Sequence, residues 1–252
     1  MISYYGELCT KMYESDKSLA DGKELDFYLS FADRKDIRVL EPMCGNGRML
    51  IPFMQRDIQI EGFDISEDML KVCIEKGNKN NLKPNVYYQK IEDFVSSHTF
   101  DLIIIPFGSF SLLPNQLVNK SLANMRSVLK EQGKLLLTIM LKGNDIEESS
   151  DWIQLEKKYI NNEWIVISKK AQYHKEQSTL FTKLKYQVVT EDKIEKTEMM
   201  DFPLRLYDVK EFENILKTNG FHHIQLHEVK DGYGEGNHFH VFECSLTELN
   251  NN

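Results

Sequence analysis

The segment Val39–Leu50, VLEPMCGNGRML, combines a carboxylate with two closely spaced glycines. An apolar run ends on Glu41, and Gly45 and Gly47 follow before a helical pattern begins. A glycine-rich loop between a strand and a helix lets a ligand approach the backbone and presents N–H groups at the start of the helix. A second acid, Asp64, ends the next predicted strand. These four residues therefore predict a ligand site at the carboxyl edge of a sheet.

The charge of the loop separates two classes of nucleotide ligand. The dinucleotide fingerprint G-x-G-x-x-G is incomplete, because Leu50 stands where its third glycine would fall. A pyrophosphate would be repelled by Glu41, whereas S-adenosylmethionine carries an ammonium and a sulfonium that a carboxylate attracts. Asp64 suits ribose hydroxyls in either class and does not discriminate. The plain alternative is a tight turn with a surface acid.

Composition describes an ordinary soluble chain. Of its 252 residues, 41% are hydrophobic and 28% are charged. No apolar run approaches the ~20 residues of a membrane span, and the N-terminus lacks a signal pattern, so we expect no membrane association. The cysteines Cys9, Cys44, Cys73 and Cys244 are scattered, which fits a reducing cytoplasm. The net charge of −8 argues against nucleic acid as a partner.

Strands and helices alternate from residue 37 to about residue 141. Strands are predicted at 37–41, 58–64, 85–89, 101–105 and 134–141. Helices are predicted at 47–55, 66–76 and 114–130, after two helices within 4–33. Ser66 is expected to cap its helix, and Gly77 and Gly133 are expected to end helices. Alternation of this kind implies a parallel sheet with right-handed crossovers.

The pattern changes between residues 152 and 201, where helical spacing is absent. Leu180, Leu184 and Tyr186 fall on one face of a strand, and Asn161-Asn162 suits a two-residue hairpin turn. An antiparallel sheet is therefore inserted before the last helix. That helix is predicted to begin at Asp208 with a capping box to Glu211 and to end at Gly220, and strands 221–229 and 238–245 follow it.

The expected fold is α/β: a Rossmann-like, mostly parallel seven-stranded sheet with helices on both faces, plus an inserted antiparallel sheet. We assign residues 1–145 to N-terminal helices and a ligand-binding core. Residues 146–205 form the inserted β lid, and residues 206–252 supply the C-terminal helix and the last strands of the core.

Four stretches carry a family resemblance: LEPMCGNGRMLIP, IEGFDISEDML, IEDF and FDLIIIPFGSFSLL. They resemble motifs of the class I S-adenosylmethionine-dependent methyltransferases, and more narrowly those of bacterial small-molecule members with an antiparallel insert. The resemblance covers roughly residues 4–245, with specific core motifs and a weakly matching insert. It implies S-adenosylmethionine as cofactor and methyl transfer to nitrogen or oxygen of a small molecule. It also leaves the insert two uses, as the wall of the acceptor pocket or as the interface of a homodimer.

The resemblance also implies which residues contact the cofactor. It places Glu41, Gly45 and Gly47 around the methionine part and Asp64 at the ribose. It places Ile65, Met69, Ile91 and Glu92 around the adenine, and Pro106, Phe107 and Gly108 beside the methyl group. In the first helix, Tyr13 would cover the sulfonium and Lys17 would pair with the methionine carboxylate; a solvent-facing amphipathic helix is the alternative.

Two positions depart from the family pattern. Met43 stands where glycine is frequent, so regular backbone is expected at the loop entrance. Lys90 stands where an acid often reads the adenine amino group, so Asp93 or the backbone would supply that contact, or it would be missing.

The residues that would act on the acceptor are not evident. A general base is optional when the methyl group is already activated. His174 is a weak candidate, beside Tyr173, Glu198, Asp201, Arg205 and Tyr207. No metal is expected, because His223, His227, His238 and His240 lack cysteine or carboxylate partners at ligand spacing.

Two other functions stay open. Ile105-Pro106-Phe107 partly matches the strand end of amino-methyltransferases that act on nucleic acids and proteins. A non-catalytic cofactor-binding module is the second alternative.

Overall fold

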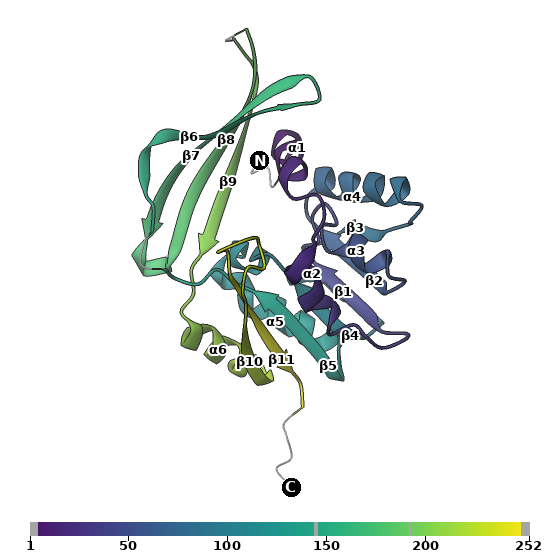
Figure 1. The fold of residues 1–252 in the computed structure, drawn as a ribbon. Helices are drawn as coiled ribbons and strands as arrows, with labels where there is room; N and C mark the ends of the chain where they lie inside the picture. Colours follow the sequence, from purple (N-terminus) through teal and green to yellow (C-terminus); the bar gives the residue numbers. More distant parts are fainter. Residues whose placement is uncertain (1–4, 144–145, 192, 248–252) are drawn as a thin grey trace.

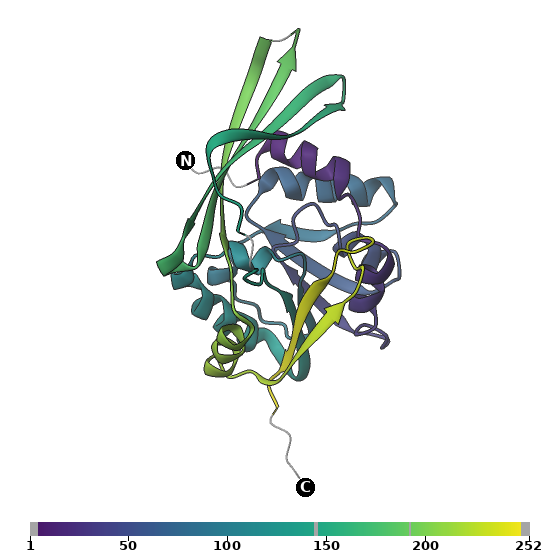
Figure 2. The same ribbon diagram turned by 60° about the vertical axis from the view of Figure 1, so that its left-hand side comes forward.

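The structure is a computed structural model, and it describes residues 5–143, 146–191 and 193–247. Its helices are α1 (Glu7–Asp16), α2 (Gly22–Leu29), α3 (Leu50–Met54), α4 (Glu67–Lys79), α5 (Asn115–Val128) and α6 (Val209–Thr218). Its strands are β1 (Arg38–Pro42), β2 (Gln59–Asp64), β3 (Asn85–Tyr88), β4 (Phe100–Ile105), β5 (Leu129–Thr138), β6 (Ser149–Ile160), β7 (Glu163–His174), β8 (Thr179–Thr190), β9 (Lys193–Arg205), β10 (His222–Val229) and β11 (Phe239–Ser245). Figure 1 and Figure 2 show a central sheet covered by helices and a second sheet beside it.

The central sheet has seven strands in the order β10-β11-β5-β4-β1-β2-β3. Neighbours among β1 to β5 pair in parallel, whereas β11 is antiparallel to both β5 and β10. The expected Rossmann-like sheet with an inserted antiparallel sheet is confirmed. The carboxyl ends of β1, β2 and β4 meet at one edge, which brings Glu41 at the end of β1 close to Asp64 at the end of β2.

The central strands are buried on both faces, which explains the uninterrupted apolar run of β4. Ile103 and Ile105 belong to a core that includes side chains of α5 and α6. Leu102 and Ile104 point to the opposite face and belong to a core that includes side chains of α2, α3 and α4. Since no solvent-facing side remains in this strand, no polar alternation is needed.

The second sheet has four antiparallel strands in the order β6-β7-β8-β9. Asn161 and Asn162 turn the first hairpin with φ of 49° and 67°, which confirms the predicted turn because a type I′ turn requires positive φ at both central positions. One face of this inserted sheet packs on α1. Tyr186 and Val188 are buried there together with Leu8.

Three glycines have other roles than the predicted ones. The helix predicted from Gly47 begins only at Leu50, because the glycine loop before it is not helical. Helix α4 continues past Gly77 to Lys79; a Cβ on Gly77 would lie 2.2 Å from Pro84, so this glycine permits close packing. Gly133 lies within β5, where a Cβ would meet the carbonyl oxygen of Phe100 at 3.0 Å.

The start of α6 agrees with its sequence signature. Asp208 is the N-cap residue, and Glu211 completes the capping box by accepting a hydrogen bond from the Asp208 backbone N–H at 3.4 Å. Ser66 caps α4 in the same manner, since its hydroxyl accepts a hydrogen bond from the Met69 N–H at 3.1 Å. The division into segments at 145/146 and 205/206 stays a prediction, and residue 145 lies outside the described residues, as does residue 4.

Helix α1 is tied to the inserted sheet at its N-terminus. The helix has no side-chain cap of its own. The carboxylate of Glu198 in β9 instead accepts hydrogen bonds from the N–H groups of Leu8 at 2.9 Å and Cys9 at 3.0 Å. A carboxylate at this position satisfies two orphan donors and complements the helix dipole. Figure 1 and Figure 2 show α1 between the inserted sheet and α4.

We expect Glu198→Ala to lower the free energy of unfolding by about 1–3 kcal/mol, the cost of leaving charge-assisted hydrogen bonds unmade. Amide hydrogen exchange at Leu8 and Cys9 should accelerate at the same time. Glu195→Ala, an exposed acid on the same strand, is the matched control and should change neither quantity. Equal exchange at Leu8 in both variants would show that Glu198 does not cap α1.

Among the residues that the structure describes, no helix is long and apolar enough to cross a membrane.

Candidate functional site

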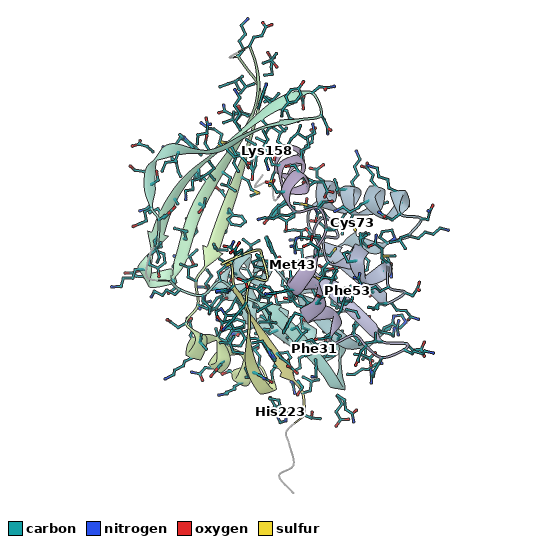
Figure 3. All side chains as sticks on the ribbon, viewed as in Figure 1. Phe31, Met43, Phe53, Cys73, Lys158 and His223 are labelled. Atoms are coloured by element: carbon teal, nitrogen blue, oxygen red, sulfur yellow. The ribbon has the colours of Figure 1, made fainter. Side chains whose placement is uncertain are left out.

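A cavity of 830 Å³ lies at the carboxyl edge of the central sheet, enclosed by α1 and the inner face of the inserted sheet. Its size suits a nucleotide-like ligand together with a second small molecule. Figure 3 shows Met43, one of its lining residues, between the central and the inserted sheets. The structure brings most of the predicted cofactor contacts to this cavity: Tyr13, Lys17, Glu41, Gly45, Asp64, Ile65, Met69, Glu92, Pro106, Phe107 and Gly108.

Four of the predicted site residues do not line the cavity. Ile91 is buried in the core beneath it, where its carbonyl accepts a hydrogen bond from Asn124 at 3.0 Å. Asp93 is exposed and forms an ion pair with Lys120 at 2.7 Å. His174 ends β7, with its ring 4.6 Å from that of Phe181. The fourth is Gly47, which acts through the shape of the loop.

Left-handed backbone shapes both strand-end loops. Gly45 and Gly47 have φ of 54° and 74°. Met43 has φ of 58°, so the expectation of regular backbone at this position is wrong. A methionine there carries the strain that a glycine would avoid, and such strain persists only where surrounding packing imposes it. The loop after β4 repeats the feature, with φ of 60° at Phe107 and 72° at Gly108.

Glu41 is a buried carboxylate with spare hydrogen-bonding capacity. Its side chain is 2% exposed, and its Oε2 has no hydrogen-bond partner among the described residues. Burial raises the pKa of Glu41 well above its usual range, and the charge of Arg48 offsets part of this effect. A cationic group in the cavity would satisfy this oxygen and restore the charged form. The ammonium of S-adenosylmethionine fits this requirement, and a pyrophosphate does not.

Asp64 organises the glycine loop from the end of β2. Its carboxylate accepts hydrogen bonds from the N–H groups of Gly45 at 2.9 Å and Ser66 at 2.8 Å. Burial raises the pKa of Asp64, and these backbone hydrogen bonds counteract the rise. A carboxylate oxygen has two lone pairs, so each oxygen can still accept a hydrogen bond from a ligand hydroxyl. The residue therefore fixes the loop and faces the cavity at once.

Two cations lie over one aromatic ring at the predicted methionine end of the cavity. The Lys17 ammonium and the Arg48 guanidinium lie 4.5 Å and 4.8 Å from the ring centroid of Phe107. Arg48 also forms an ion pair at 2.5 Å with Glu24, whose side chain is fully buried. The Nε and Nη1 atoms of Arg48 are buried without a hydrogen-bond partner among the described residues. These donors suit a ligand carboxylate.

Arg48 was not among the site residues predicted from the sequence. The available signal was its position directly after Gly47, where an arginine faces the unfavourable end of a helix dipole. Its partner Glu24 lies in α2 and carries no motif, so only the fold reveals the pair.

The predicted adenine end is more polar. Ile65 and Met69 line it beside Glu92 and Lys90. With Asp93 turned to solvent, Lys90 and Glu92 are the charged side chains of this end among the described residues.

A second missed element is the glycine-rich loop between β10 and β11. Tyr233 of this loop lies 5.0 Å from Phe107, ring centroid to centroid, and His238, Phe239 and His240 also line the cavity. The signal was the stretch DGYGEGNHFH, whose glycines predict a tight loop but not where it packs.

The predicted general bases lie away from the cavity. Glu198 caps α1, Asp201 pairs with Lys183 at 3.0 Å, and Arg205 pairs with Glu211 at 2.7 Å. Tyr207 is buried in the core below. Tyr173 and His174 do not line the cavity, whereas His238 and His240 do. Within the described ranges, no group of three histidine, cysteine, aspartate or glutamate side chains could hold a metal ion.

Comparison with known proteins agrees with this geometry. Residues 39–133 match the family model described as a methyltransferase domain. A protein of Geobacillus sp. (strain WCH70), named as a methyltransferase, is 25% identical over 103 residues, which span 40% of this chain and 42% of the relative.

Solved structures share the fold over nearly the whole chain. An S-adenosylmethionine-dependent methyltransferase from Clostridium acetobutylicum superposes with a TM-score of 0.74 at 17% identity, covering 94% of this chain and 97% of the other. The sugar N-methyltransferase KedS8 from a Streptoalloteichus species gives 0.69 at 13% identity, covering 98% and 94%. Residues 39–133 thus resemble a methyltransferase domain, and the chain as a whole shares its fold with these S-adenosylmethionine-dependent enzymes.

Proposed function

We propose that this protein binds S-adenosylmethionine in the cavity and transfers its methyl group to nitrogen or oxygen of a small molecule. The observation that carries the proposal is the Oε2 atom of Glu41 at the end of β1, beside Asp64 at the end of β2: this buried atom has no hydrogen-bond partner among the described residues. Together they offer a counter-charge for a cation and acceptors for ribose hydroxyls.

The bound cofactor would supply a methyl group on a sulfonium, and the carbon–sulfur bonding pair would stay on sulfur when an acceptor lone pair forms the new bond. The protein has three tasks around that group. Glu41, Arg48 and Lys17 would hold the amino acid part, and Asp64 the ribose. Helix α1 and the inserted sheet exclude water and confine the acceptor, which is how a site gains rate when no acid or base is required.

The acidic chain disfavours a nucleic-acid acceptor. Its net charge of −8 repels phosphate on average. A protein side chain or a purely binding role would use the same cofactor site, so turnover separates these alternatives. KedS8 is named as a sugar N-methyltransferase, which supports a small-molecule acceptor here.

Titration calorimetry tests the cofactor half of the proposal. We expect S-adenosylmethionine and S-adenosylhomocysteine to bind at micromolar levels and NAD far more weakly. Tight binding of NAD without binding of S-adenosylhomocysteine would overturn the proposal. Release of S-adenosylhomocysteine in the presence of small amines and alcohols tests catalysis, and nucleic acid and protein fractions serve as competing acceptors.

We expect Asp64→Ala to weaken cofactor binding by about 1.5–3 kcal/mol, the range for hydrogen bonds to a charged group. The variant should also unfold more easily, since the N–H groups of Gly45 and Ser66 lose their acceptor. Asp64→Asn retains one acceptor oxygen and should lose less on both counts. Calorimetry measures the first effect and urea unfolding the second. Unchanged cofactor affinity in Asp64→Ala would place the ribose elsewhere.

A further inference from the structure

The cavity has a second end whose composition differs from the end that holds Glu41 and Asp64. Strand β8 contributes Leu184, and strand β9 contributes Met200, Phe202 and Leu204. Leu184 pairs with Met200 across the two strands, so these side chains share one face of the inserted sheet. The opposite face carries the Lys183–Asp201 ion pair at 3.0 Å, which marks it as the solvent side.

The central domain supplies the facing wall. Leu112, Leu113 and Leu117 come from the turn after β4 and the start of α5, and Ile139 and Leu141 follow β5. These apolar side chains face the inserted sheet across the cavity. A molecule that enters between the two walls therefore meets apolar side chains on both sides.

The polar groups at this end are mostly engaged. The Thr138 hydroxyl accepts a hydrogen bond from the Gly108 N–H at 2.6 Å and donates to the Ile105 carbonyl at 3.3 Å. Glu156 pairs with Lys158 at 3.1 Å. The Nδ1 atom of His238 accepts a hydrogen bond from the Asp231 N–H at 2.9 Å.

A sugar is poorly suited to such walls. Each hydroxyl that enters without a partner gives up its hydrogen bonds to water, which costs free energy. An apolar body gains free energy from the same burial.

The same apolar surroundings indicate which kind of acceptor atom receives the methyl group. Burial among apolar groups favours the neutral form of an amine, whose lone pair is then free to attack. A hydroxyl would first need a base, and the leucine, isoleucine, methionine and phenylalanine side chains of the two walls cannot act as one.

We propose that the acceptor is a hydrophobic amine: an aliphatic or aromatic body that lies between the inserted sheet and the Leu112–Leu117 wall, with one amino group toward Phe107 and Gly108. This inference rests on the proposed function of the same cavity. The amine enters neutral and gains the methyl group while the carbon–sulfur pair stays on sulfur. The resulting ammonium loses its proton to water on release.

Three matched compounds test the proposal by turnover. Cyclohexylmethylamine, cyclohexylmethanol and glucosamine differ in the reacting atom or in the polarity of the body. We expect kcat/KM for cyclohexylmethylamine to exceed that for either of the others at least tenfold. A higher kcat/KM for glucosamine would overturn the proposal that the acceptor has an apolar body. A higher kcat/KM for cyclohexylmethanol would overturn the proposal that the reacting atom is an amine nitrogen.

A binding arm decides the question even when turnover is slow for all three. N-phenylnaphthylamine, a fluorescent apolar amine, should bind the complex with S-adenosylhomocysteine. Leu184→Asn, and Leu204→Asn as a second variant, should weaken it at least tenfold. Phe181→Asn changes an apolar side chain on the opposite face of β8 and should leave its affinity within twofold.

The outcomes distinguish failure of the proposed cofactor binding from failure of the proposed acceptor class. Failure of S-adenosylhomocysteine to bind the wild-type protein overturns the proposed function and this inference with it. If S-adenosylhomocysteine binds but the apolar probe does not, or if Leu184→Asn and Phe181→Asn have equal effects, only the inference falls.

Discussion

Glu41→Gln is expected to weaken S-adenosylmethionine binding roughly 30- to 3,000-fold, about 2–5 kcal/mol, the usual cost of removing one partner of a buried charge pair. In the free protein the same change removes a buried carboxylate whose Oε2 has no partner within the described part of the chain. The free energy of unfolding at neutral pH should therefore stay constant or rise. Calorimetry and urea unfolding give the two quantities. Loss of binding without loss of stability distinguishes a ligand counter-charge from a structural group.

The pH dependence gives an independent signature of Glu41. Burial raises the pKa of Glu41 in the folded protein above its value in the unfolded chain. The folded state then binds more protons between the two pKa values, so this group's contribution to stability is fully present below the unfolded pKa and is lost as pH rises through the folded pKa. A cationic ligand prefers the ionised carboxylate, so cofactor affinity should increase as pH rises through the pKa of Glu41 in the folded protein.

Glu41→Gln should abolish both pH effects. Glu67→Gln makes the same change of charge on the exposed face of α4 and is the control; its affinity and pH profile should match the wild type. An affinity of Glu41→Gln within threefold of the wild type would mean that the cation is held elsewhere.

Gly47→Ala is expected to lower the free energy of unfolding by roughly 2–5 kcal/mol. Left-handed backbone at φ of 74° costs an alanine about 1–2 kcal/mol, and overpacking adds about 1–3 kcal/mol. The overpacking arises because the new Cβ would lie 2.4 Å from the sulfur of Cys73. Figure 3 shows Cys73 among the side chains of α4. Urea unfolding measures the loss.

Gly45→Ala is the matched control for Gly47→Ala. Gly45 has φ of 54°, but a Cβ there meets no atom within 4 Å, so only the backbone cost of about 1–2 kcal/mol applies. The double variant Gly47→Ala/Cys73→Ala should recover part of the loss relative to the sum of the single changes. Equal destabilisation by the two glycine variants would show that contact with Cys73 does not constrain the loop.

Features that depend on residues close together in the chain could be predicted before the fold was known. The apolar run of β4 predicts a strand covered on both faces, and Asp208 with Glu211 predicts the start of α6. Glu41 and Asp64 could be placed at one edge because parallel strands align their carboxyl ends. Local dihedral preferences and side-chain periodicity are encoded over a few residues, so they can be recognised without the fold.

The ends of helices and strands were harder to predict from the sequence. Gly77 and Gly133 were predicted to end helices, since glycine disfavours helix interiors. Both instead serve close approaches, to Pro84 and to the carbonyl of Phe100, that only the packed molecule contains. The left-handed backbone of Met43 likewise opposes its intrinsic preference and is imposed by the surrounding structure.

The closure of the cavity depends on long-range contacts that no local pattern in the sequence predicts. Glu198 caps α1 through Leu8, 190 positions earlier in the chain. Tyr233 reaches Phe107 from the loop between β10 and β11, and Arg48 of the glycine loop meets Glu24 of α2. These contacts join residues that are far apart in the chain, and the local sequence around one partner does not indicate the other. Their energies depend on burial and on charges brought together by the fold, and such terms do not exist in the separate segments.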